Sequence, residues 1–319
     1  MTSADVGMRD LSVIAETGAK VVHLPAIATQ DWCESAAQVL LTVRRSSAVV
    51  VTIADLPMKE GGDGDFRVEA TGGASGLSGV GADSLGRVHT DAGRGLGWTF
   101  SGGPADHSVS GMGNGIIGVD GVRVARLRDL ASWSNWPITA AGKRWSRLGV
   151  SELLVVQTPL VKEEPGRVLC VEYGVQRDQP VFSRAEAMVA SAVMGVLRER
   201  ALLAFGTEAT SMSNRVTKRE QEILEQLTLG KTVRDIADVL NRSPHTVHDH
   251  VKSLHRKLNA SSRGELIARY LGHIERCGGR TRRARLRRNE ATAHNGQHAG
   301  VHINKVAVGE ATEAEAERS

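Results

Sequence analysis

Helix-start signals repeat at close intervals in the last third of the chain, and they constrain the fold more than any other feature of the sequence. Thr217 and Ser262 each precede a glutamate by three residues, which is the spacing of a capping box that satisfies free backbone donors at a helix start. Thr232 and Ser243 are caps of the same chemical type, and Pro244 has a backbone angle suited to a first helical turn. This part of the chain therefore predicts a run of four short helices.

The same segment also carries the stop signals and apolar stripes of a small helical domain. Gly230 and Asn241 lie where the first and second helices would end, and both residue types accept the left-handed backbone found there. Apolar residues recur at helical spacing, which predicts one buried face for each helix. In the first, second and fourth helices, the expected core residues are Ile223, Leu224, Leu227, Ile236, Ala237, Val239, Leu240, Leu266, Ile267 and Tyr270.

The third helix, predicted over residues 244–258, has two opposite faces. A rotation of about 100° per residue gathers apolar side chains on one face and polar side chains on the other. A helix of this width fits the major groove of DNA, where base edges present distinct donors and acceptors, and the tight turn at 241–243 sets its docking angle. These features predict a helix-turn-helix DNA-binding unit. Its apolar face comprises Val247, Val251, Leu254 and Leu258, and its polar face His245, His248, Asp249, Lys252 and Arg256.

This segment resembles the LuxR-type DNA-binding domain of bacterial response regulators and quorum sensors. The resemblance implies dimers on two-fold DNA sites near promoters, with base contacts at the positions of His248, Asp249 and Lys252. It also implies phosphate contacts from Thr246 and flanking basic residues. The residues that carry the resemblance are Thr217, Arg219, Glu220, Gly230, Ile236, Ala237, Leu240, Ser243, Thr246, Val247, His250, Val251, Lys257, Leu258 and Arg263. The expected DNA-binding residues are Ser243, His245, Thr246, His248, Asp249, Lys252, Arg256 and Lys257.

Two positions on the predicted reading face depart from the pattern of that family. His248 stands where the family often has lysine, and Asp249 stands where it has a neutral residue. A carboxylate that faces DNA is repelled by phosphate unless it reaches a donor such as a cytosine amino group. Two interpretations therefore stay open: the chain reads an unusual DNA sequence, or Asp249 lies off the contact surface.

Charge is unevenly distributed along the 319 residues, whose formal net charge is +4. Residues 1–214 contain 20 Lys and Arg against 23 Asp and Glu, whereas residues 215–273 contain 11 against 7. Residues 274–319 contain 9 against 6 and end in a low-complexity stretch. A positive C-terminal third is typical of a part that meets a polyanion. We expect 274–319 to be a basic, disordered tail that either adds phosphate contacts or is merely solvated.

The N-terminal part of the chain has the element order of an α+β module, expected over residues 31–205 after an N-terminal segment at 1–30. A helix is predicted from Asp31 to Val43, followed by a buried strand at 48–53. Further along, the sequence predicts a strand at 66–70, a hairpin of two strands at 153–161 and 167–173, and a capped helix from Ser183 to Phe205.

This N-terminal part resembles a GAF-like sensor domain, with a PAS-like sensor as the alternative. The resemblance rests on the order of helix, strand, hairpin and closing helix, and the glycine-rich loops expected at 61–121 fit it poorly. A polar linker is expected at 206–214, before the helical domain at 215–273. The predicted fold is thus an α+β GAF/PAS-like sensor module followed by an all-α four-helix helix-turn-helix domain.

The leading hypothesis is a sequence-specific transcriptional regulator, and not an enzyme, in which the sensor module controls the DNA-binding domain. The expected partners are double-stranded promoter DNA, a second copy of the chain, RNA polymerase, and an unknown small-molecule or protein signal. No cofactor and no membrane partner are expected. No apolar run reaches the ~18 residues that span a bilayer, and the three cysteines are scattered, so we expect a cytoplasmic protein.

Other interpretations have less support in the sequence. Gly113, Gly115 and Gly118 match a GxGxxG dinucleotide motif, but no convincing strand precedes them and no acidic residue follows about 20 positions later. This match is the only support for a nucleotide-binding or enzymatic N-terminal domain with a DNA-targeting tail. A third hypothesis makes the N-terminal region a dimerisation and docking platform without a ligand. The four histidines at 245, 248, 250 and 255 point to different sides of one helix, which argues against a shared metal ion.

Overall fold

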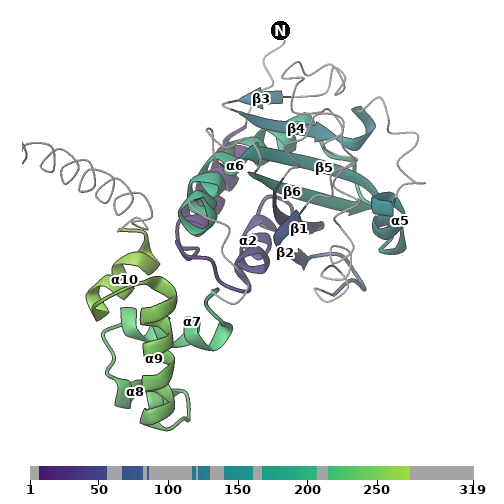
Figure 1. The fold of residues 1–319 in the computed structure, drawn as a ribbon. Coiled ribbons are helices and arrows are strands. Elements are labelled where there is room, and N and C mark those ends of the chain that lie inside the picture. The colour runs from purple at the N-terminus through teal and green to yellow at the C-terminus, as the bar shows by residue number, and fades with distance from the viewer. Residues whose placement is uncertain are drawn as a thin grey trace, which may run out of the picture. The chain divides into compact units, whose positions relative to one another are not determined.

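The computed structural model describes residues 7–55, 67–81, 85, 117–119, 121–129, 140–160, 167–206 and 215–273. Among these residues, the N-terminal part combines helices with a sheet, and the C-terminal part is built from helices (Figure 1). The predicted fold class, an α+β part followed by an all-α part, is therefore confirmed.

The strands of the N-terminal part form one antiparallel sheet of order β2-β1-β6-β5-β4-β3. The strands are β1 (Ala48–Asp55), β2 (Arg67–Ser75), β3 (Ile117–Val119), β4 (Val122–Arg126), β5 (Val150–Pro159) and β6 (Arg167–Gln176). The helices are α1 (Met8–Val21), α2 (Trp32–Leu40), the short 3-10 helix η2 (Leu127–Asp129), α5 (Ala140–Arg147) and α6 (Arg184–Phe205). β5 and β6 pair as the predicted hairpin, and the turn between them lies outside the described residues.

Apolar layers cover both faces of this sheet. On one face, α1, α2 and α6 pack over alternate side chains of the strands, such as Val49 and Tyr173. Figure 1 shows α2 and α6 beside the strands that they cover. On the other face, a smaller cluster contains Trp145 of α5 together with Val50 and Cys170. Because successive residues of a strand point to opposite faces, burial on both sides explains the nearly continuous apolar sequence of β1.

β2 contains a glycine pair that was predicted to lie in a loop. A Cβ atom on Gly72 would lie 2.3 Å from the backbone nitrogen of Glu34 in α2, which no real side chain tolerates. Gly73 pairs with Val50 of β1. The glycines therefore let α2 approach the sheet closely and do not interrupt the strand. Gly118 of the GxGxxG match lies in β3, and residues 113–116 lie outside the described part of the chain.

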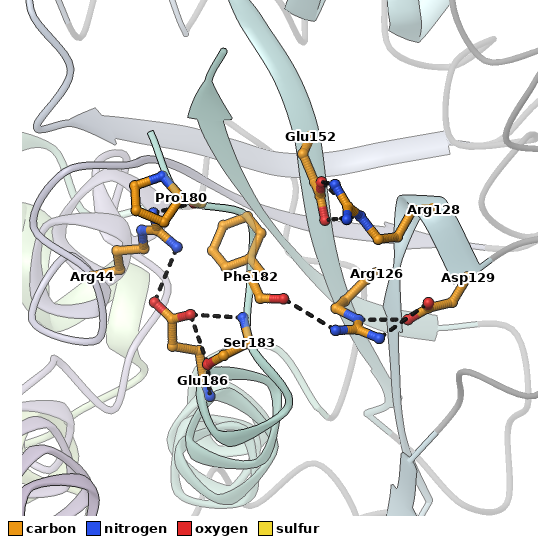
Figure 2. Close-up of polar contacts among 9 residues, drawn as sticks. All are labelled: Arg44, Arg126, Arg128, Asp129, Glu152, Pro180, Phe182, Ser183 and Glu186. Atoms are coloured by element: carbon orange, nitrogen blue, oxygen red, sulfur yellow. Dashed lines mark hydrogen bonds and ion pairs between the residues drawn. The ribbon is translucent and has the colours of Figure 1, made fainter. Parts of the chain in front are cut away.

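Two arginines tie the start of α6 to the rest of the N-terminal part (Figure 2). The hydroxyl of Ser183 accepts from the backbone N–H of Glu186 at 3.1 Å, and the Glu186 carboxylate accepts from the backbone N–H of Ser183 at 2.8 Å. This geometry confirms the predicted capping box. Arg44 donates to the same carboxylate at 3.0 Å and lies over the ring of Phe182. From β4, Arg126 donates to the carbonyl oxygen of Phe182 at 3.2 Å, so the first turn of α6 is held from two directions.

The C-terminal helices begin where their caps predict. They are α7 (Lys218–Thr228), α8 (Val233–Val239), α9 (Pro244–Leu258) and α10 (Arg263–Leu271). The side chains of Thr217, Thr232, Ser243 and Ser262 each accept from the backbone N–H three residues later. In α10 the Glu265 carboxylate accepts from the backbone N–H of Ser261, so the reciprocal half of that predicted capping box is shifted by one residue.

One apolar core joins these four helices. Val239 was also expected there but is 55% exposed. It is the last residue of α8, whose buried face is formed by Ile236 and Ala237. Gly230 and Asn241 have φ angles of 83° and 49°, which confirms their predicted role at the helix ends. The remaining predicted core residues are confirmed as buried or partly buried members of the core: Ile223, Leu224, Leu227, Ile236, Ala237, Leu240, Val247, Val251, Leu254, Leu258, Leu266, Ile267 and Tyr270.

This core also contains Ile27, which comes from the segment between α1 and α2. The side chain of Ile27 is 1% exposed within the cluster. The backbone N–H of Ala26 donates to the carbonyl of Tyr270 at 3.0 Å, and that of Val216 donates to the carbonyl of Ala28 at 3.1 Å. Thr29 and Val216 form a parallel β-bridge. An N-terminal segment that carries no clear sequence signal therefore completes the C-terminal helical domain.

Candidate nucleic-acid interface

The cap of α9 fixes the start and direction of the helix. The hydroxyl oxygen of Ser243 accepts from the backbone N–H of Thr246 at 3.1 Å and lies 2.8 Å from the Thr246 hydroxyl. Pro244 occupies the first turn, and Asn241 closes the preceding turn in the left-handed conformation. Ser243 and Thr246 are both exposed. Two of the predicted DNA-binding residues therefore lie at a helix start, where the positive end of the helix dipole favours an anion such as phosphate.

α9 has the two faces that its sequence predicts. Val247, Leu254 and Leu258 are at most 2% exposed, and Val251 is half-buried. The core therefore fixes one side of the helix and leaves the other open to solvent. The predicted polar face is exposed at every position, namely His245, His248, Asp249, Lys252 and Arg256.

Asp249 lies between two basic groups on this exposed face. Its carboxylate is 3.6 Å from Nε2 of His245 and 3.9 Å from Nζ of Lys252. Both distances exceed a normal hydrogen bond, and 56% of the Asp249 side chain is exposed. Asp249 therefore shares its face with the other predicted contact residues, which removes the structural reason for placing it off the contact surface.

Lys257 differs from the other predicted DNA-binding residues because it is engaged inside the domain. Its Nζ donates to Oε2 of Glu220 at 2.7 Å and to the carbonyl oxygen of Arg215 at 2.8 Å, and 13% of its side chain is exposed. Burial alone would raise the pKa of Glu220, but hydrogen bonds from Lys257 and Thr217 bring that pKa below its ordinary value. Lys257 therefore holds α9 against α7.

The histidines of α9 lie in two different environments. His245 and His248 are exposed, whereas His250 and His255 are half-buried. Nδ1 of His255 lies 2.7 Å from the carbonyl oxygen of Ala260, at the end of the helix. Within the described part of the chain, no group of three His, Cys, Asp or Glu side chains could hold a metal ion. The exposed pair is left as hydrogen-bonding groups on the predicted reading face.

Two arginines with roles in this domain were not in the predicted DNA-binding set. Arg263 donates to the carbonyl oxygens of Leu227 and Lys231 at 3.1 and 2.7 Å, and it thereby closes the C-terminal end of α7. Arg242 is exposed in the turn that precedes α9. The position of Arg242 directly before the cap of α9 is the sequence signal for a DNA-binding role, because an arginine there suits contacts with the DNA backbone.

Comparison with known proteins assigns the helical domain to a family. Residues 214–270 match the family model described as bacterial regulatory proteins, luxR family. The chain is 45% identical over 67 residues to the nitrate/nitrite response regulator protein NarP of Escherichia coli, which covers 21% of this chain and 30% of NarP. It is 36% identical over 62 residues to the spore germination protein GerE of Bacillus subtilis, which covers 19% of this chain and 84% of GerE. The chain belongs to the luxR family of bacterial regulatory proteins.

The luxR-family match confirms the resemblance predicted from the sequence. The family consists of regulatory proteins, as expected from the sequence. The match lies in the C-terminal helices, and the chain spans less than half the length of the first curated relatives it matches. A crystal structure of Escherichia coli SdiA aligns with a TM-score of 0.30 and 15% identity, covering 73% of this chain and 86% of that chain. This similarity is too low to assign the N-terminal part to a fold family. None of the helices in the described residues is both long and apolar enough to cross a membrane.

Proposed function

We propose that this luxR-family protein is a sequence-specific transcriptional regulator that reads the major groove of promoter DNA with α9. The observation that carries the proposal is the exposed polar face of α9, which lies opposite a face fixed in the core. A rigid helix with hydrogen-bonding groups along one side can present several of them to base edges at once. The proposed base-contacting residues are His245, His248, Asp249, Lys252 and Arg256.

The start of α9 supplies the phosphate contacts in this proposal. Ser243 and Thr246 are exposed at the positive end of the α9 helix dipole, and Arg242 is exposed in the turn before them. Contacts of this kind position a reading helix without selecting a sequence. Lys257 is left out of the contact set because Glu220 already engages its ammonium group.

Binding of the full chain to a library of genomic fragments tests the proposed function. We expect an affinity that falls steeply with salt, because phosphate contacts release counterions. Lys252→Ala should weaken binding and relax the base preference by about 1–3 kcal/mol at one position. Lys218→Ala removes the same charge at the exposed start of α7 and should leave the base preference intact. A full chain without any salt-dependent DNA affinity would overturn the proposal.

A homodimer acting on DNA in the cytoplasm is part of the same proposal. Supporting observations are the exposed apolar residues Met8 and Leu11 of α1 and Val22, which directly follows that helix; they are 83%, 53% and 53% exposed. Sedimentation of the full chain should give a dimer mass, and Leu11→Glu should shift it toward a monomer if α1 contributes to the interface. A monomer at all concentrations that bind DNA would contradict this part. RNA polymerase contact is proposed from family membership alone.

We further propose that the N-terminal module senses a small-molecule signal. The supporting observation is a pair of buried polar side chains in the apolar layer around Trp145. Gln157 lies opposite Cys170 in the β5–β6 register, and Glu172 follows Cys170 by two residues, so both point to this layer. Each is 6% exposed, and Oε1 of Gln157 has no hydrogen-bond partner among the residues that the structure describes. A buried amide oxygen without a donor suits a ligand that supplies one.

Thermal unfolding of the full chain against a metabolite library tests the sensor proposal. A ligand that binds only the folded state raises the unfolding temperature with its concentration. Gln157→Leu removes the free amide oxygen at nearly constant size and should abolish that response, whereas Gln179→Leu, outside the sheet, should retain it. If no compound stabilises the chain, the alternative of a docking platform without a ligand is favoured.

We propose that Arg215 links this module to the DNA-binding domain. The guanidinium of Arg215 is nearly buried, donates to the carbonyl oxygen of Glu69 in β2 and lies 5.8 Å from the ring centre of Phe205. Val216, the next residue, is bridged to Thr29. These contacts support the proposal that a change at the sheet is passed on to the reading helix.

A further inference from the structure

Asp249 is the one acidic group on the exposed face of α9, and its oxygens are not engaged in tight hydrogen bonds. The contacts of the carboxylate with His245 at 3.6 Å and Lys252 at 3.9 Å are longer than normal hydrogen bonds. The side chain is 56% exposed and points away from the buried face of the helix. It therefore keeps the capacity to accept hydrogen bonds from a partner outside the protein.

The two neighbouring basic groups remove the main objection to a carboxylate in a DNA interface. Lys252 lies one turn after Asp249 and His245 one turn before it, so positive or neutral donors flank the negative charge on the same face. In an interaction with DNA, Lys252 offsets the repulsion between the carboxylate and nearby phosphates. Asp249 can therefore approach the groove without leaving an isolated negative charge there.

Only one base offers a carboxylate a donor without a competing acceptor in the major groove. Cytosine presents its amino group alone, guanine presents two acceptors, and thymine presents an acceptor and a methyl group. Adenine presents an amino group beside the N7 acceptor, which repels a carboxylate but suits the amide of asparagine or glutamine. The chemistry of Asp249 therefore selects cytosine.

Lys252 adds a preference for a second base beside the one that Asp249 selects. Three residues along a helix correspond to a rise of about 4.5 Å, which is close to the spacing of about 3.4 Å between successive base pairs. A lysine that reaches base edges prefers the two acceptors of guanine. We propose that Asp249 selects a cytosine and Lys252 an adjacent guanine, so that this pair fixes a C·G-containing step in the DNA site. The inference rests on the proposed function, because it requires that α9 reads DNA.

Selection of bound sites from a random duplex pool tests the inference with the full chain. The wild-type pool should contain one position that is almost always cytosine, and replacing that C·G pair by each other pair should lower affinity roughly 5- to 150-fold. Asp249→Ala should make that position indifferent. Asp249→Asn should move its preference toward adenine, because the amide can pair with both N6 and N7 of that base.

Asp238→Asn is the matched control, since it removes an equal charge from an exposed position on α8. It should change affinity for all sites alike and leave the selected sequence unchanged. The base-pair replacements in the DNA use only the wild-type protein, so they test the requirement for cytosine even if a protein variant folds poorly. An Asp249→Ala chain that selects the same sequence as the wild type, or a wild-type site without the cytosine, would overturn the inference alone. Failure of the wild-type chain to bind DNA would overturn the proposed function as well.

Discussion

Nζ of Lys257 lies 2.7 Å from Oε2 of Glu220, and this ion pair joins the reading helix α9 to the first helix of the domain. The Glu220 side chain is 4% exposed and also accepts from the backbone N–H of Thr217 at 2.8 Å, so one carboxylate caps α7 and anchors α9. The orientation of the reading face therefore depends on a contact that lies behind it.

Lys257→Met should destabilise the helical domain by about 1–3 kcal/mol, because it leaves a buried carboxylate without its charged donor. Chemical denaturation followed by circular dichroism measures the change. Lys218→Met, at an exposed position of α7, is the control and should change stability by less than about 0.5 kcal/mol. Equal stability of the two variants would show that the pair does not support the domain.

Ser243→Ala should lower stability by about 1 kcal/mol through loss of the cap at the start of α9. Ser243→Asn keeps a capping oxygen and should restore most of that loss, which separates capping from size. Thermal unfolding of the three chains makes the comparison. An alanine variant as stable as the wild type would mean that the turn alone fixes the helix start.

Glu172 should make stability depend on pH. Burial raises the pKa of this carboxyl from 4.5 to about 7, against a smaller opposing effect of Arg144. Between these two values the folded chain binds more protons than the unfolded chain, so stability falls as the pH rises from about 4.5 to 7 and stays lower above that range. The shift corresponds to about 3 kcal/mol.

Glu172→Gln should remove that slope, as measured by the free energy of unfolding at several pH values from 4.5 to 8. Asp178→Asn removes an exposed carboxyl near the end of β6 and should retain the slope of the wild type. An unchanged slope in Glu172→Gln would assign the pH dependence to other groups.

Gly72→Ala should destabilise the N-terminal module by about 3 kcal/mol, because the added methyl group meets the backbone of α2. Gly195→Ala is the opposite case, since its Cβ would have no atom within 4 Å and the glycine lies inside α6. It should stabilise the chain by about 0.5–1 kcal/mol. Calorimetry of both variants tests the pair, and a harmless Gly72→Ala would contradict the close approach of α2.

Ile27→Ala should destabilise α7–α10 by about 2–5 kcal/mol, because it opens a cavity in their core. Val181→Ala, at a position that is 45% exposed, is the control and should have little effect. Amide hydrogen exchange localises the change to individual helices. Unchanged protection of α7–α10 in Ile27→Ala would show that the segment between α1 and α2 does not complete this domain.

The helical domain could be predicted almost residue by residue because its signals are local. Thr217, Ser243 and Gly230 act on backbone groups within a few positions of themselves, so their spacing in the sequence is also their spacing in space. The two faces of α9 follow from the same regularity. Lys257 shows the limit of this reasoning, because contacts with Glu220 and Arg215, distant in the sequence, distinguish it from the exposed Lys252.

The N-terminal module was predicted less fully because its remaining elements depend on distant partners. α1 packs Val13, Ile14 and Val21 against the core but also exposes Met8 and Leu11, so large apolar residues occur on its outer side as well as on its inner side. Gly72 by itself suggests a loop, and only the close approach of the α2 backbone explains why a glycine lies in this strand. Local signals in this part are the alternating Val122 and Val124 of β4 and the polar and apolar faces of α1 and α5.

The bridge between Thr29 and Val216 has a consequence for folding during synthesis. Ile27 leaves the ribosome early, and the helices whose core it enters are synthesised only after the whole sheet module. Domains made first generally begin to fold first. The DNA-binding domain therefore completes its core only when an already synthesised segment meets newly made helices, which links the appearance of DNA-binding competence to the synthesis of α7–α10.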